Sequence, residues 1–278
     1  MSSSARAVPE DPLAGGAPAL HFAGSLLRNR KSRIENRIGQ TYAALLGYGH
    51  GGSAGVRRVA PPTMTIHEGQ PVVYAGTALA EAQAVVILLH GRGGTAEDIL
   101  PLGHQLHKAV PGLALVAPQA RDDSWYPQRF LAPLEQNEPH LSSALSLVAE
   151  IVDELIGRTI PREKIVIGGF SQGACLSLEF AVRHSQRLGG VLAFSGALMG
   201  PITGRHELHG SVHGTPFFLG CGDRDHHIPV ESVEASAKVI AGVSGAVTKR
   251  IYPGMGHEIN ADEIHHAVEL LKVVIRGR

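Results

Sequence analysis

The feature that most constrains the fold is a regular alternation of short apolar runs with longer amphipathic stretches, from residue 61 onward. Continuous runs rich in Val, Ile, Leu and Phe are typical of strands buried on both faces of a parallel sheet. The expected strands are Ala84–Leu89, Leu113–Ala117, Lys164–Gly168, Gly190–Phe194, Pro216–Cys221 and Ala246–Tyr252. The expected helices between and after them are Ala96–Ala109, Leu141–Gly157, Gln172–His184, Val230–Gly242 and Asp262–Ile275.

Strands that alternate with helices predict right-handed crossovers and a mostly parallel, doubly wound central sheet flanked by helices, which is an α/β fold. Before this pattern, Thr63–His67 and Pro71–Ala75 flank Glu68-Gly69-Gln70, and we expect them to form a hairpin. Open α/β sheets bind their ligands at the carboxyl ends of the strands. The loops after the strands are therefore where functional residues are expected.

Composition excludes several classes of function. Hydrophobic residues make up 44% of the chain and its formal net charge is zero, so a large core is expected and nucleic acid is not an expected partner. The longest apolar run is too short to span a bilayer. Cys175 and Cys221 fall in expected buried elements, which predicts reduced thiols in a cytoplasmic protein. No Cys or His spacing indicates a metal site, and no cofactor is expected.

Residues 1–60 differ from the rest in being rich in Ser, Ala, Gly and Arg. They lack the apolar core of a secretory signal peptide. We expect an N-terminal extension that is either flexible or an oligomerisation arm, the latter giving a homodimer. Residues 61–278 are then the catalytic domain.

The strongest functional motif is Gly169-Phe170-Ser171-Gln172-Gly173, which follows an expected strand and opens an expected helix. This context is the one that the nucleophile elbow of α/β-hydrolases requires, because glycines let the chain turn sharply around an exposed serine. The alternative is a glycine-rich turn without catalytic function. We predict that Ser171 is a nucleophile.

A nucleophilic serine needs a histidine base, which an acid orients. The α/β-hydrolase order is Ser, acid, His, each after a later strand. His257 is the histidine in the loop between the last expected strand and the last expected helix, and it is the predicted base. Asp223 and Asp225 both follow the strand before, so the residues alone leave two candidates for the acid.

An oxyanion hole needs two backbone N–H donors aimed at one point. One is expected from Gln172, directly after the nucleophile, and the other from Arg92 in the glycine-rich loop His90-Gly91-Arg92-Gly93-Gly94. An apolar acyl pocket is expected from residues near these loops. They are Trp125, Tyr126, Phe130, Leu131, Leu198, Met199 and Ile228.

Four motifs in this order resemble the phospholipase/carboxylesterase family of α/β-hydrolases, which includes bacterial carboxylesterases and acyl-protein thioesterases. They are His90–Gly93, Gly169–Gly173, Gly222–Pro229 and Gly254–His257. The resemblance implies that Ser171 is the nucleophile, His257 the base and Asp225 the acid, since Asp225 matches the aspartate of the family's Asp-x-x-Val-Pro pattern. It also implies that Arg92 and Gln172 are the oxyanion donors. The thioesterase members usually carry leucine where this chain has Arg92, which favours the bacterial esterase branch.

The predicted function is a serine carboxylesterase that hydrolyses short- to medium-chain esters of small molecules through an acyl-enzyme. A thioesterase or lysophospholipase of the same family is the nearest alternative. Two rivals belong to other classes: a metal-dependent hydrolase that uses Asp223, Asp225, His226, His227 and His257 as ligands, and a binding protein that keeps the fold without catalysis.

Overall fold

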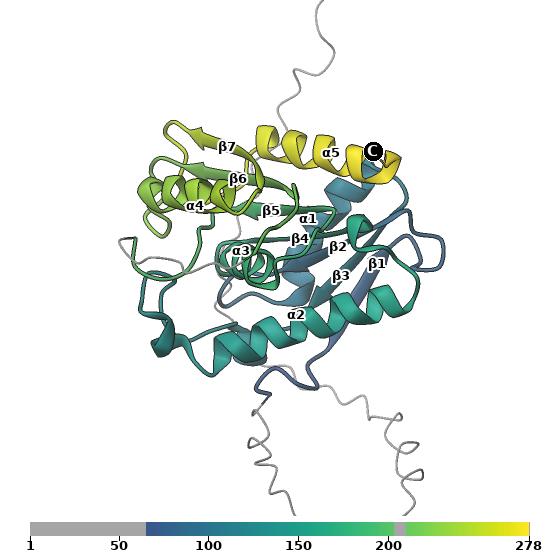
Figure 1. Cartoon of the computed structure of the whole chain (residues 1–278), viewed down its shortest axis with the longest axis horizontal. Coiled ribbons are helices and arrows are strands. Elements are labelled where there is room, and N and C mark those ends of the chain that lie inside the picture. The colour runs from purple at the N-terminus through teal and green to yellow at the C-terminus, as the bar shows by residue number, and fades with distance from the viewer. Residues whose placement is uncertain (1–64, 203–209, 278) are drawn as a thin grey trace, which may run out of the picture.

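Seven strands form one sheet in the order β1-β3-β2-β4-β5-β6-β7 in the computed structural model, which describes residues 65–202 and 210–277 (Figure 1). The strands are β1 (Val72–Gly76), β2 (Ala84–Leu89), β3 (Leu113–Pro118), β4 (Ile165–Phe170), β5 (Gly190–Phe194), β6 (Pro216–Gly222) and β7 (Ala246–Tyr252). The α-helices are α1 (Ala96–Ala109), α2 (His140–Gly157), α3 (Gln172–His184), α4 (Val230–Gly242) and α5 (Ala261–Arg276). The predicted extension over residues 1–60 lies outside the described residues.

The sheet is parallel from β3 through β7, and β1 pairs antiparallel with β3 at its edge. Every residue of β2 is buried, as a strand covered on both faces requires. The predicted doubly wound α/β fold and its six parallel strands are confirmed, with boundaries that differ by one or two residues.

The predicted hairpin before this sheet is wrong. Thr65 and His67 lie in a turn, and Val72–Gly76 pairs with β3 instead. The reason is that His67 is buried and fully hydrogen-bonded: its Nδ1 accepts from the Arg121 amide and its Nε2–H donates to the Trp125 carbonyl. These bonds hold the turn against the loop that follows β3.

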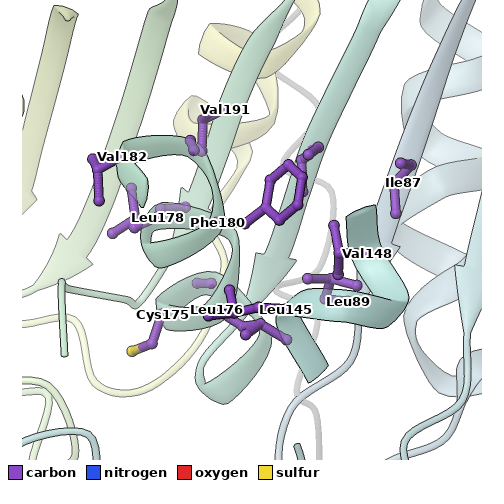
Figure 2. Packing of buried hydrophobic residues seen from close by; sticks show 14 of the residues in the cluster. Ile87, Leu89, Leu145, Val148, Cys175, Leu176, Leu178, Phe180, Val182 and Val191 are labelled. Atoms are coloured by element: carbon purple, nitrogen blue, oxygen red, sulfur yellow. The ribbon is translucent and has the colours of Figure 1, made fainter. Parts of the chain in front are cut away.

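Two hydrophobic layers cover the sheet. Alternate residues of β2 divide between them: Ile87 and Leu89 pack with α2, α3 and α4, whereas Val86 and Leu88 pack with α1 and α5. Figure 2 shows the first layer, in which Ile87 and Leu89 lie near Val148 of α2 and α3 contributes Phe180. Because each such side chain contributes about 1.5–3 kcal/mol when fully buried, these layers fix the strand ends firmly.

The strand order brings functional loops together in pairs. The loop after β2 lies next to the loop after β4, since these strands are paired. The loops after β6 and β7 are neighbours for the same reason. Both pairs open at the carboxyl edge of the sheet, where α/β folds place their ligands.

Candidate active site

Ser171 stands at a sharp turn between β4 and α3. Its backbone has φ 56° and ψ −116°, a left-handed conformation that a non-glycine residue rarely adopts. The turn brings neighbouring chain so close that a Cβ at Gly169 would lie 2.4 Å from the Leu89 carbonyl oxygen, and one at Gly173 would lie 2.0 Å from it. Glycine is thus required at both positions because the Leu89 carbonyl lies so close. The backbone strain of the turn lies at Ser171, the candidate nucleophile.

The hydroxyl of Ser171 is not used to cap α3. A serine at the N-cap usually accepts a hydrogen bond from a helix amide, but the Ser171 side chain makes no such bond. Its Oγ lies 2.9 Å from Nε2 of His257 instead. This distance allows the imidazole to take the hydroxyl proton.

His257 is held on its other side by Asp225. The carboxylate oxygen Oδ2 of Asp225 lies 2.6 Å from Nδ1 of His257. The imidazole also contacts the rings of Phe170 and His227, each with its centroid 4.7 Å away. A buried carboxylate that accepts from Nδ1 leaves Nε2 free to act as a base toward Ser171.

Asp225 is held in place by its second oxygen. Oδ1 accepts hydrogen bonds from the His227 and Ile228 amides, at 2.8 and 2.9 Å. Burial opposes ionisation of this carboxyl, but the hydrogen bond and charge of His257, with the two amides, outweigh burial and lower the pKa of Asp225. Asp225 is therefore a carboxylate at neutral pH.

Asp223, the other candidate acid, has a different position. Its Oδ1 accepts from the Gly254 amide at 2.6 Å, and its own amide donates to the Tyr252 carbonyl. It is exposed and braces the loop before His257 rather than the imidazole itself.

The loop after β2 lies directly against Ser171. A Cβ at Gly91 would be 3.5 Å from the Ser171 Cβ. His90 braces this loop: the Ala120 amide donates to its Nε2, so Nδ1 carries the proton and donates to the Gly91 carbonyl at 2.8 Å. Within the described residues, the Arg92 and Gln172 amides have no hydrogen-bond acceptor. Two free amides beside a serine are the donor arrangement that an oxyanion hole uses.

A pocket of about 580 Å³ opens over Ser171 and His257. Of the predicted acyl-pocket residues, Tyr126, Phe130 and Ile228 line it. Further residues line the pocket that no sequence motif indicated, because they lie on helix α1 and on the loop after β3: Glu97, Asp98, Ile99, Pro101 and Arg129. His227 lines it too; it lies in the Gly222–Pro229 motif but was considered only as a ligand in a metal-dependent hydrolase. Cys175 lies at its buried end, where burial raises the pKa of the thiol to about 12.

Trp125, Leu131, Leu198 and Met199 do not line this pocket. Trp125 is fully buried, with its indole N–H donating to the His90 carbonyl at 2.9 Å, so it supports the loop after β2. Leu198 and Met199 are drawn into the core because their amides donate to Ser236 Oγ and Glu179 Oε1. Leu131 packs, half-buried, against the same core.

The side chains of Arg92 and Gln172 have a role that the sequence did not indicate. The Arg92 guanidinium donates to Ser124 Oγ and to the carbonyls of Pro127 and Gln128. The Gln172 amide group accepts from the Trp125 amide and donates to the Tyr126 carbonyl. Together they tie the two segments of the predicted oxyanion hole to the loop after β3, which contributes Tyr126, Arg129 and Phe130 to the pocket.

Over residues 65–202 and 210–277, no group of three or more His, Cys, Asp or Glu side chains could hold a metal ion. None of the helices in these ranges is long and apolar enough to cross a membrane. Cys175 and Cys221 are buried free thiols.

Known proteins resemble the chain over most of this structure. A sequence model described as phospholipase/carboxylesterase matches residues 70–275. A crystal structure of a phospholipase/carboxylesterase from Dyadobacter fermentans is 40% identical, covering 73% of this chain and 97% of that one, with a TM-score of 0.69. Acyl-protein thioesterase 1 of Saccharomyces cerevisiae is 26% identical over 69% of this chain and 92% of its own length. Its counterpart from Eremothecium gossypii is 34% identical, but the match spans 47% of this chain and 56% of that protein, little more than half its length. The chain therefore belongs to the phospholipase/carboxylesterase family of α/β-hydrolases, which makes it a serine ester hydrolase.

Proposed function

We propose that the chain hydrolyses short- to medium-chain carboxylic esters of small molecules, with Ser171 as nucleophile, His257 as base and Asp225 as the orienting acid. The observation that carries the proposal is the unbroken line of hydrogen bonds from Asp225 through His257 to Ser171, which ends in an open pocket. Residues 61–278 form the catalytic domain in this proposal.

The reaction proceeds in two steps. His257 Nε2 takes the Ser171 proton as Oγ attacks the ester carbonyl carbon, and the carbonyl oxygen becomes an oxyanion that accepts from the Arg92 and Gln172 amides. The carbon–oxygen bond to the alcohol then breaks, and His257 returns the proton to the departing alcohol. Water, deprotonated by His257, then attacks the acyl carbon; the bond to Ser171 Oγ breaks, His257 returns the proton to Oγ, and the acid is released.

Two features support modest substrate size. The pocket volume of about 580 Å³ suits a small organic molecule rather than a long lipid chain. Its walls combine apolar side chains, such as Tyr126, Phe130 and Ile228, with polar groups near Ser171. The thioester alternative is favoured by the relatives from Saccharomyces cerevisiae and Eremothecium gossypii, which are named acyl-protein thioesterase 1.

The test is a series of 4-nitrophenyl esters from acetate to palmitate, assayed beside an acyl-CoA thioester, with the wild type and two variants. Ser171→Ala and His257→Ala are each expected to lower kcat by several orders of magnitude, because each removes a group that acts in the transition state. Wild-type activity should be highest on esters with short to medium acyl chains and should be unchanged when a metal chelator is added. Full activity in Ser171→Ala, or activity lost to chelators, would refute the proposed chemistry.

A further inference from the structure

Within residues 65–202 and 210–277, the active-site pocket contains one arginine whose guanidinium makes no hydrogen bond to the protein. Its charged residues are Arg92, Arg129, Glu97 and Asp98. The Arg92 guanidinium is engaged by the pocket loop, and Asp98 closes the capping box of α1 with Thr95. Within the described part of the chain, the Arg129 guanidinium has neither a hydrogen-bond acceptor nor an ion-pair partner.

The backbone that carries Arg129 is nevertheless firmly held. The Arg129 carbonyl accepts from the Ala132 amide at 3.0 Å and from the Asn137 side chain at 3.4 Å. Fully buried Asn137 also accepts from the Gln128 amide, and the next carbonyl along, that of Phe130, accepts from the Gly200 amide. A fixed backbone with a free guanidinium differs from a loose surface loop, because binding a ligand there need not order the chain.

The neighbours of Arg129 indicate which part of a substrate would reach it. Tyr126 and Phe130 lie on the same loop and line the same pocket as Ser171, so an acyl chain seated on Ser171 can run along them. A guanidinium binds a carboxylate through parallel N–H donors better than it binds any neutral group. We infer that Arg129 binds a carboxylate at the far end of the acyl chain, so that the preferred substrates are monoesters of dicarboxylic acids. The inference rests on the proposed esterase function.

Long-range charge attraction does not account for such a preference. Glu97 also lines the pocket, and with Arg92, Arg129 and Asp98 it brings the sum of these four charges to zero. Selectivity must then come from direct contact with Arg129. The negative charge of Glu97 repels a carboxylate in the pocket, so Glu97→Gln should strengthen binding of an anionic acyl group.

The experiment compares mono-4-nitrophenyl adipate with 4-nitrophenyl hexanoate, which share a leaving group and an acyl chain of equal length. The ratio of their kcat/KM values is measured for the wild type, Arg129→Gln, Arg129→Lys and Glu97→Gln. Arg158→Gln is the matched control, because Arg158 is an exposed arginine that pairs with Glu154 on α2 and lies outside the pocket.

In Arg129→Gln the adipate-to-hexanoate ratio should fall about tenfold, mainly through KM, as loss of one solvent-accessible charge-assisted contact implies. In Arg129→Lys the adipate-to-hexanoate ratio should lie between the values of the wild type and Arg129→Gln. Glu97→Gln should raise the ratio, and Arg158→Gln should leave it unchanged. A ratio that changes less than about twofold in Arg129→Gln, or falls equally in Arg158→Gln, overturns the inference. Hydrolysis of hexanoate with an unaltered ratio refutes only the role of Arg129, whereas no hydrolysis of either ester by the wild type refutes the proposed function.

Discussion

Two loop regions meet at the active site, and they are held in different ways. The loops after β6 and β7 carry Asp225 and His257, and backbone hydrogen bonds join them, from the Asp223 amide to the Tyr252 carbonyl and from the Arg224 amide to the Met255 carbonyl. The loop after β3, residues 119–133, is held instead by side chains of Arg92, Gln172 and Asn137. The first region carries the proposed catalytic residues Asp225 and His257, and the second forms part of the pocket wall.

This difference predicts how each region responds to mutation. Where backbone groups fix a loop, the side chains on it are free for chemistry, and losing one should impair turnover with little change in the fold. Where side chains fix a loop, losing one should shift the pocket wall and impair substrate binding.

The largest effect is expected in the first region. Asp225→Asn should lower kcat/KM by about a thousandfold or more, because an amide cannot hold His257 in the required tautomer. Asp223→Asn should lower it less than about tenfold, since an asparagine oxygen can still accept from the Gly254 amide. Steady-state kinetics on one 4-nitrophenyl ester measures both, and the reverse ranking would move the acid to Asp223.

A smaller effect is expected in the second region. Arg92→Ala keeps the backbone amide proposed for the oxyanion hole but removes the side-chain bonds to Ser124, Pro127 and Gln128. KM should rise about tenfold with a lesser change in kcat, because the loop that lines the pocket loses its tether. The same assay with Arg158→Gln is the control. A fall in kcat alone would mean that the Arg92 side chain acts in the transition state, and the comparison between the two regions would fail.

The last prediction concerns stability rather than activity, and a residue that packs against β6, the strand before the Asp225 loop. Glu263 is fully buried beside Gly220 of β6, its Oε1 has no hydrogen-bond partner within the described residues, and burial raises the pKa of this carboxyl to about 8. The folded state thus holds a proton that the unfolded chain releases above its ordinary pKa of 4.5. Between these two values the contribution of Glu263 to stability falls by about 1.4 kcal/mol for each unit that the pH rises.

Glu263→Gln should remove this dependence, because a glutamine oxygen can still accept from the Asn260 amide at any pH. Urea unfolding of the wild type and the variant at pH 5.5 to 7.5 (roughly within the window that linkage sets) measures the difference between their slopes. Equal slopes would show that Glu263 is ionised in the folded protein.

The sequence predicted the first region better than the second for a physical reason. Ser171 and His257 each lie in a loop directly after a strand, so their positions follow from the order of the strands. The strands in turn are marked in the sequence by runs of apolar residues. The residues alone left Asp223 and Asp225 open, and only the family pattern favoured Asp225. In the structure the imidazole contacts Asp225, while Asp223 contacts Gly254.

The pocket could be predicted only in part. Trp125 was expected in the acyl pocket because it lies near the active-site loops, yet it is fully buried outside the pocket, where its indole N–H donates to the His90 carbonyl. The hairpin prediction failed for a similar reason, since His67 bonds to residues more than fifty positions away. Contacts of this kind depend on the whole fold and leave no local pattern. Arg129 was missed because charged residues on exposed loops are common, and His227 was considered only as a metal ligand.

The most direct test of the account is covalent labelling of the nucleophile. Folded wild-type protein is treated with a fluorophosphonate, and the modified residue is located by peptide mass spectrometry. We predict one adduct, on Ser171, that is lost in Ser171→Ala and strongly slowed in His257→Ala. An adduct on another residue, or none on folded protein that hydrolyses esters, would contradict the central claim that Ser171 attacks the acyl carbon.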